Sequence, residues 1–365
     1  MKLDIYLIKR FIVSFLTVLI IMCCISILLE MTEYIRKYDI NKISLVILFR
    51  LSLLNLPKMI YQILPLVILL SSLWMYISLS RTSELVILRA SSMSAIRSLL
   101  GPVATTFFIG LLSIFFLNPI IVATSKYHQS IIDNFTNSTR AITAVLEKGL
   151  WMRQDTNKGQ IIIQASKSDP TATFFNDLTM YGFNKSGKAT YHLKAATASL
   201  DSGSWNLKQV RYWNFDTLSD AGTQGMDFSE FSITTNVTPI QILKGFSEPN
   251  TTTLWELPKL ISRLDQAGFP SIKHKIWFQM ELANPILLIC MVVIASAFVT
   301  KHARISNVGL SILIALSLGF GIYFLKNFAN VLGQNLQIPV LVAAWAPPLA
   351  GIFISLGFLL HIEDG

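Results

Sequence analysis

The run that most resembles a catalytic motif lies between Gly182 and Ala189. It reads Gly-Phe-Asn-Lys-Ser-Gly-Lys-Ala, with glycines and lysine spaced as in a loop that holds nucleotide phosphates. Such a loop needs Ser or Thr after the lysine to bind magnesium, and it joins a strand to a helix. Here Ala189 follows the lysine, and strand-like runs lie on both sides. The run therefore predicts a hairpin turn, and we expect this chain to hydrolyse no ATP by itself.

The cysteine and histidine residues do not indicate a metal site or a redox site. The three cysteines, Cys23, Cys24 and Cys290, all lie in apolar runs, where they form no disulfide framework or zinc spacing. The five histidines are scattered, and none is spaced with cysteine or carboxylate as metal ligands are. We expect neither a cofactor nor a metal.

A polar segment between two apolar runs, residues 81–93, has the features of a docking site. A hydroxyl residue before Glu84 can cap a helix, and Glu84 near the helix start suits the helix dipole. Leu85 and Leu88 share one face. The pattern predicts a short amphipathic helix at about 81–95, which a partner ATPase could hold; a helix that merely lies on lipid is the alternative. The expected coupling residues are Arg81, Ser83, Glu84, Leu85, Leu88 and Arg89.

The elements that position these residues are mostly membrane spans. Only 14% of the residues are charged and 52% are hydrophobic, whereas a soluble globule has about 25% charged residues. Six runs lack charge, and about 20 residues of helix cross the apolar core of a bilayer. The runs are 11–29, 59–80, 98–125, 282–300, 305–325 and about 338–360. They predict six transmembrane helices. No Asp, Glu, Lys or Arg lies at mid-depth in these runs, whereas ion-coupled transporters usually keep such groups, so the energy for any transport must come from a partner.

Basic residues near the ends of the runs predict the orientation. If the N-terminus is inside, three short segments that carry basic residues lie in the cytoplasm. Their basic residues are Lys2, Lys9 and Arg10 in the first, Arg81, Arg89 and Arg97 in the second, and Lys301 and Arg304 in the third. Segment 30–58 is then external yet basic, with Arg36, Lys37, Lys42, Arg50 and Lys58. This exception marks a candidate site for an anion, although cations that reach ordinary lipid headgroups would have the same composition.

Residues 126–275 have the composition of a soluble domain. Strand-like runs at 159–165, 178–183, 189–200, 205–215 and 228–235 are separated by turn signals, and 254–268 favours a short helix. The sequence thus predicts an inserted antiparallel β domain, a sandwich or open barrel. We expect transmembrane helices in 1–125, this external domain in 126–275, and transmembrane helices again in 276–365.

The order of these parts resembles the lipopolysaccharide export permeases LptF and LptG. The motif Arg81-x-Ser83-Glu84-Leu85-Val86, the start Leu3-Asp4-x-Tyr6 and the run Gly149-Leu150-Trp151 resemble the LptG branch more than the LptF branch. LptF remains the nearest alternative. Two residues depart from the family pattern: Ser92 replaces a frequent Gly, and Glu30 stands where relatives can carry a lipid-facing base.

The resemblance implies an ABC transporter permease of the Gram-negative inner membrane, with both termini cytoplasmic. Its partners would be an LptF-like permease in a heterodimer, an LptB-like ATPase dimer and an LptC-like single-span protein. The complex would extract lipopolysaccharide and pass it along periplasmic jellyroll-like β domains. Here Arg36, Lys37 and Lys42 would hold the lipid A phosphates, Ile161 and Ile163 would line a lipid groove, and spans 11–29 and 308–325 would border lateral gates.

Two other classes compete with a transport subunit. A membrane enzyme acting on lipid or glycan needs clustered acids, His or Arg at the membrane edge, and only Glu30, Glu33 and Asp39 qualify as acids. A structural or adhesion protein needs neither six spans nor a cytoplasmic docking helix. Co-purification with an ATPase separates the first class from both.

Overall fold

The chain forms two compact units, residues 1–129 with 276–365 and residues 130–275. The computed structural model describes residues 2–37, 45–82, 84, 95–136, 142–146, 149–156, 159–169, 171–184, 186–201, 203–215, 225–235, 237–239, 242, 252–302 and 308–363.

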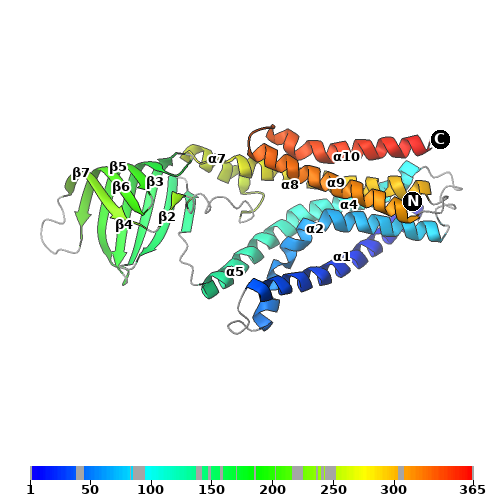
Figure 1. Cartoon of the computed structure of the whole chain (residues 1–365), viewed down its shortest axis with the longest axis horizontal. Coiled ribbons are helices and arrows are strands. Elements are labelled where there is room, and N and C mark those ends of the chain that lie inside the picture. The colour runs from blue at the N-terminus through cyan, green and yellow to red at the C-terminus, as the bar shows by residue number, and fades with distance from the viewer. Residues whose placement is uncertain are drawn as a thin grey trace. The chain divides into compact units, whose positions relative to one another are not determined.

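The first unit, called the helical unit, contains the predicted membrane spans (Figure 1). Its elements are α1 (Lys2–Lys37), α2 (Leu45–Arg81), α4 (Ala95–Leu112), the π-helical turn η1 (Ser113–Leu117), α5 (Asn118–Thr136), α8 (Ile272–His302), α9 (Val308–Gln334) and α10 (Val340–Glu363). Because α4, η1 and α5 run on as one span, six helices among the described residues are long and apolar enough to cross a membrane. The prediction of six spans is confirmed.

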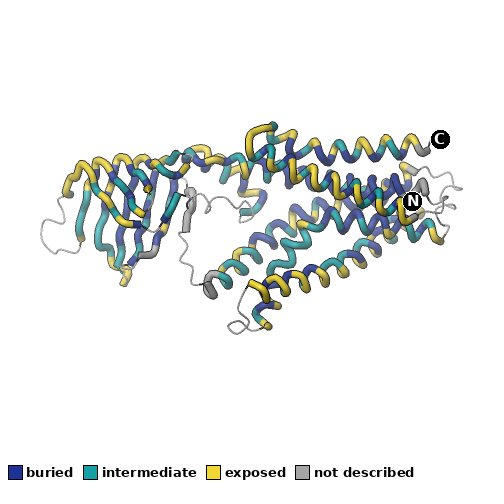
Figure 2. Tube along the Cα trace, in the orientation of Figure 1, coloured by how far each residue is buried: buried dark blue, intermediate teal, exposed yellow. Residues whose placement is uncertain are grey.

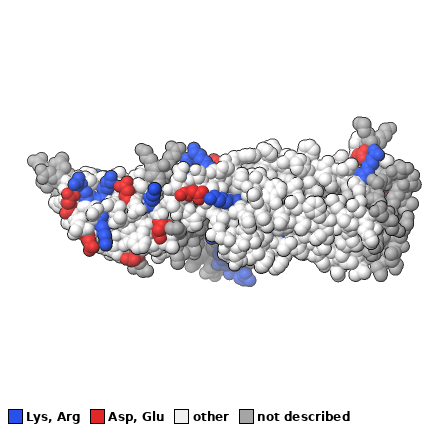
Figure 3. Space-filling view, turned by 90° about the horizontal axis from the view of Figure 1, so that it is seen from above, with Lys and Arg blue, Asp and Glu red and all other residues white. Residues whose placement is uncertain are grey.

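The outer surface of this unit is apolar, as a lipid-facing surface must be. Large side chains such as Leu28, Phe324 and Phe353 are 66%, 70% and 69% exposed. In water such a surface would aggregate, whereas in a bilayer the apolar lipid tails surround it at no cost in free energy. On the face seen in Figure 3, the part formed by the helical unit carries almost no charged side chain between the two ends of that unit. By contrast α8 is the central helix, buried along most of its length (Figure 2).

Close packing in the helical unit depends on glycine. A Cβ atom added to Gly110 on α4 would lie 2.9 Å from the Cα of Pro285 on α8. Any larger residue would force the two helices apart, and overpacking of this kind costs about 1–3 kcal/mol.

The second unit, called the sheet unit, is a single antiparallel sheet. Its strands are β1 (Ile142–Leu146), β2 (Gly149–Thr156), β3 (Gly159–Ser168), β4 (Phe174–Asn184), β5 (Ala189–Asp201), β6 (Ser204–Asn214) and β7 (Met226–Thr234). They pair in chain order, so the described strands form a meander with β1 and β7 at its edges. The last five strands coincide with the five strand-like runs of the sequence. β1 and β2 were not predicted as strands, because their residues show weaker alternation.

Helix α7 (Leu257–Ala267), the helix expected near 254–268, packs against β1, β2 and β3 at the apolar face of the sheet. Its Leu264 and Ala267 join the same apolar core as Ile161 and Ile163 of β3. The two isoleucines are only 8% and 1% exposed. They point to one face, as expected, but that face is a filled core in this structure and not an open groove.

The run from Gly182 to Ala189, which resembles a phosphate-binding loop in sequence, forms the turn between β4 and β5. The Asn184 side-chain oxygen accepts hydrogen bonds from the backbone N–H groups of Ser186 at 3.1 Å and Lys188 at 2.9 Å, and Gly187 has a φ of 80°. An Asx-type turn of this kind satisfies its own amides and joins two strands. The predicted hairpin is confirmed.

Candidate functional site

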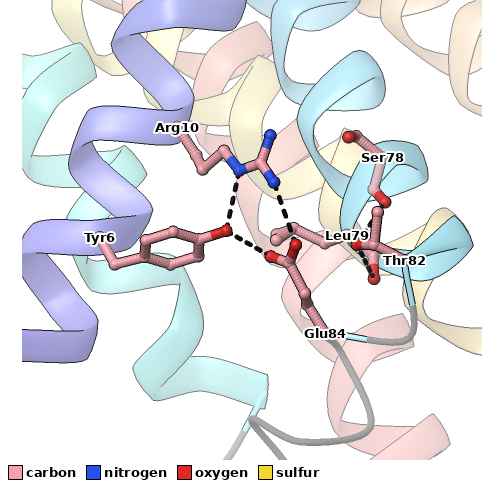
Figure 4. Close-up of polar contacts among 6 residues, drawn as sticks. All are labelled: Tyr6, Arg10, Ser78, Leu79, Thr82 and Glu84. Atoms are coloured by element: carbon pink, nitrogen blue, oxygen red, sulfur yellow. Dashed lines mark hydrogen bonds and ion pairs between the residues drawn. The ribbon is translucent and has the colours of Figure 1, made fainter.

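A compact polar cluster joins the start of α1 to Glu84, three residues beyond the end of α2 (Figure 4). We call it the Glu84 cluster, and it consists of Tyr6, Arg10 and Glu84. The Tyr6 hydroxyl donates to Glu84 Oε2 at 2.5 Å, and Arg10 Nη2 donates to Glu84 Oε1 at 3.0 Å. Arg10 Nε also donates to the Tyr6 hydroxyl at 2.9 Å. The three side chains thus close a ring of hydrogen bonds.

The sequence brings these groups together through helix periodicity. Tyr6 and Arg10 are four residues apart on α1, so they lie on one face, one turn above the other. Their guanidinium and ring are also in contact, with the Arg10 Cζ atom 5.6 Å from the centre of the Tyr6 ring. The last turn of α2 is extended by Thr82, whose N–H donates to the Ser78 carbonyl at 3.1 Å. Glu84 follows two residues later.

The cluster stabilises the charged form of Glu84. The hydrogen bond from the Tyr6 hydroxyl, helped by Thr82 and Arg10, outweighs partial burial and holds the pKa of the carboxyl below its ordinary value. The Arg10 and Glu84 side chains are 40% and 26% exposed. Ion pairs this exposed contribute only about 0–1 kcal/mol to stability. The geometry of the cluster, more than its energy, is what can matter for function.

The structure describes two of the six residues expected to couple to an ATPase. Arg81 is the exposed last residue of α2, and Glu84 lies in the cluster. Ser83, Leu85, Leu88 and Arg89 lie outside the described residues. Sequence reasoning missed Tyr6 and Arg10 as partners of Glu84. Their four-residue spacing was a possible signal, but nothing local indicates a contact with a residue more than 70 positions away.

The cations predicted to meet an anion lie at the opposite end of α1. Arg36 and Lys37 occupy its last turn and are both exposed, where they also complement the helix dipole. Lys42 lies outside the described residues. Lys58 of α2 is also near, since the charges of Lys37 and Lys58 both act on the ring of His128 on α5. Lys58 was noted in the basic segment but not assigned to the site.

Glu30, the acid that would oppose an anion here, points away from the surface. Its side chain is 7% exposed and accepts a hydrogen bond from Asn55 Nδ2 of α2 at 2.7 Å. Nearby, Tyr34 and His128 share a hydrogen bond of 2.6 Å, and Arg50 donates to the Tyr127 hydroxyl at 2.7 Å. These contacts tie α1, α2 and α5 together. A lipid-facing position for Glu30, as the family pattern suggests, does not hold in this structure.

A second buried carboxylate lies inside α8, one residue before the charge-free run that was expected to form this span. Glu281 of α8 is 7% exposed and accepts a hydrogen bond from Tyr61 of α2. The amide of Asn284 donates to the Tyr61 oxygen at 3.2 Å, and the charges of Glu281 and Lys326 act on each other. Delimiting spans by charge-free runs places every charge at a span end. The helices are longer than those runs and enclose both residues.

Six helices among the described residues are long and apolar enough to cross a membrane, and a β sheet is inserted between the third and the fourth of them; together they define a multi-pass membrane protein with an inserted soluble domain. The family model described as "Lipopolysaccharide export system permease LptF/LptG" matches residues 5–361. The chain therefore belongs to the LptF/LptG family of lipopolysaccharide export permeases, non-catalytic subunits of a transport complex.

Two relatives are similar to this chain over most of its length. The "Lipopolysaccharide export system permease protein LptG" of Escherichia coli (strain K12) is 22% identical over 370 residues, covering 98% of each chain. The protein of the same name from Haemophilus influenzae (strain ATCC 51907 / DSM 11121 / KW20 / Rd) is 21% identical over 322 residues, covering 85% of each chain.

Proposed function

We propose that this chain is the LptG-type half of a heterodimeric permease, with an LptF-like chain as the other half. An LptB-like ATPase dimer docks at the segment that begins near Glu84, and an LptC-like single-span protein completes the assembly. The observation that carries the proposal is that the two ends of α1 carry different polar groups. One end meets the predicted docking segment through Glu84, and the other presents the exposed cations Arg36 and Lys37.

The topology follows from the same difference between the two ends. We place the Glu84 end and both termini in the cytoplasm and the Arg36 end, together with the sheet unit, in the periplasm. Both termini lie at one end of the helical unit (Figure 1), which agrees with this placement. α1 has 36 residues, or about 54 Å of helix, enough to reach both surfaces of a bilayer.

The ligand of the external cations is the phosphate of lipid A. A phosphate dianion at the membrane surface binds most strongly to donors that are charged and partly desolvated. Arg36 can offer two parallel N–H donors to one phosphate, whereas Lys37 and Lys42 act as point charges. The side chain of Glu30 is buried against Asn55, so it does not occupy the exposed surface beside Arg36 and Lys37.

The sheet unit receives the lipid in the periplasm. Its exposed edge strand β7 can pair with the β domain of a partner, because an edge strand offers unpaired main-chain groups. Ile161 and Ile163 lie in the core beneath α7, so an acyl chain could reach them only if α7 moves off that face. Photocrosslinking to lipid from these positions, dependent on ATP, tests the conduit role.

The proposal is tested on the complex purified in mild detergent. Replacing Arg36 and Lys37 together with Glu should lower the amount of co-purified lipopolysaccharide by about tenfold, because each reversal turns an attraction into a repulsion. Attachment of the LptF-like chain and of the ATPase should stay at the wild-type level. The matched control is Arg36→Lys, which keeps the charge and removes the two parallel N–H donors of the guanidinium. It should lose much less of the co-purified lipopolysaccharide. Wild-type lipopolysaccharide in the double variant would overturn the assignment.

A further inference from the structure

We infer that Tyr6 and Arg10 are positioning residues that fasten Glu84 to α1, so that movement at the ATPase contact reaches α1 directly. The inference rests on the proposed function, in which Glu84 belongs to the docking segment. It adds a mechanical connection that the docking role alone does not require. A docking residue could equally have been carried by α2 alone.

The connection depends on how the two carboxylate oxygens of Glu84 are used. Oε2 accepts from the Tyr6 hydroxyl at 2.5 Å and Oε1 accepts from Arg10 Nη2 at 3.0 Å, and both donors come from α1. Each oxygen of a carboxylate has two lone pairs, so each can accept a second hydrogen bond. Glu84 can therefore hold a cation of the ATPase while it stays bound to α1.

The ring also restricts the direction in which Glu84 can move. Arg10 Nε donates to the Tyr6 oxygen at 2.9 Å, so both donors are held in place by each other before they reach the carboxylate (Figure 4). Thr82 caps the end of α2 with its N–H and hydroxyl on the Ser78 carbonyl, at 3.1 and 3.0 Å. Only one residue separates Thr82 from Glu84. The end of α2, Glu84 and the first three turns of α1 therefore move together.

The energy of the ring excludes a mainly stabilising role. Because the ion pair is 40% and 26% exposed, its loss should cost the folded protein about 1 kcal/mol or less. A variant that breaks the ring should consequently fold and assemble. What it should lose is the transfer of motion to α1.

The test uses the assembled, ATPase-containing complex in proteoliposomes loaded with lipopolysaccharide. Tyr6→Phe removes one hydroxyl and Arg10→Gln removes one cation. Lys9→Gln is the matched control, because it removes the same charge from the neighbouring exposed position of α1. The two ring variants should keep ATPase attachment and the melting temperature of the complex. The lipopolysaccharide released per ATP hydrolysed should fall about three- to tenfold, whereas Lys9→Gln should match the wild type.

A double-mutant cycle separates positioning from other effects. In a Glu84→Gln background, adding Arg10→Gln should lower the release per ATP no further, since both act through one contact. Ring variants that behave like Lys9→Gln, or that add their full effect in that background, would overturn the inference. The docking role of Glu84 is tested separately by Glu84→Lys. Wild-type attachment of the ATPase in that variant would overturn the docking role, whereas the results of the ring variants bear only on the connection to α1.

Discussion

The two ends of α1 use the same residue types in opposite ways. At the Glu84 end, Arg10 is engaged by a tyrosine and a carboxylate of its own chain, with every partner defined by a hydrogen bond. At the other end, Arg36 and Lys37 are exposed in the last turn, while the buried acid Glu30 is satisfied by Asn55. Arg10 holds a fixed geometry within the chain, whereas cations as exposed as Arg36 and Lys37 can also attract an anion from outside.

This contrast assigns different physics to the two ends. The Glu84 end depends on direction, because its ion pair is too exposed to contribute much energy. The role proposed for the Arg36 end depends on charge, because binding of a phosphate there would require cations more than a fixed geometry. Variants that move charge at one end should therefore leave the activity of the other end unchanged.

The largest effect is expected from charge reversal at the Glu84 end. Glu84→Lys would set a cation against the basic group expected on the ATPase and against Arg10, and should weaken ATPase attachment by at least about tenfold. Glu33→Lys makes the same change at an exposed position near the other end of α1 and should leave attachment intact. Quantitative pull-down of the ATPase measures both. Equal losses in the two variants would end the contrast between the ends.

A smaller effect is expected when Glu30 loses its donor. Asn55→Leu leaves a buried carboxylate without the 2.7 Å hydrogen bond and should cost the helical unit about 1–3 kcal/mol. Adding Glu30→Leu removes the stranded charge and should restore most of the loss. Thermal unfolding of the detergent-solubilised complex measures both changes. An unchanged melting temperature in Asn55→Leu would mean that Glu30 finds other partners.

The smallest effect concerns pH. Since the pKa of Glu84 is held below its ordinary value of 4.5, the cluster favours the folded state above that value and loses this contribution as pH falls through the lowered pKa. The difference in melting temperature between wild type and Glu84→Gln should therefore be small and constant from pH 7 to about pH 5, and should shrink below. A difference that already vanishes near pH 6 would contradict the lowered pKa.

Most of the fold could be predicted from the sequence because its signals are local. Charge-free runs identify the spans, and alternation with turn residues identifies β3 to β7. Local signals fail where an ionisable residue is buried by other helices. Glu281 looked like the boundary of a span, and only its contact with Tyr61, 220 positions away, makes it an interior residue.

The candidate site was predictable in part for the same reason. The excess of basic residues after the first run predicted Arg36 and Lys37 as candidates, and the position of Glu84 at an expected helix start predicted a docking segment there. The partners of these residues come from other helices. Tyr6, Arg10 and Asn55 carry no signal of their contacts in their own neighbourhood, because hydrogen bonds between helices depend on the rotation of each helix about its axis.

The π-helical turn η1 sets one of these rotations. A π turn has the form of an α-helix with one residue inserted, and each residue of an α-helix turns the chain by about 100°. Everything after Leu117 is therefore rotated relative to an unbroken helix, including Tyr127 and His128, which reach Arg50 and Tyr34. Deleting one residue between 113 and 117 would shorten the span by only about 1.5 Å. It would also turn the rings of Tyr127 and His128 away from their partners. The π turn η1 therefore sets the rotation of the second half of the span about the helix axis.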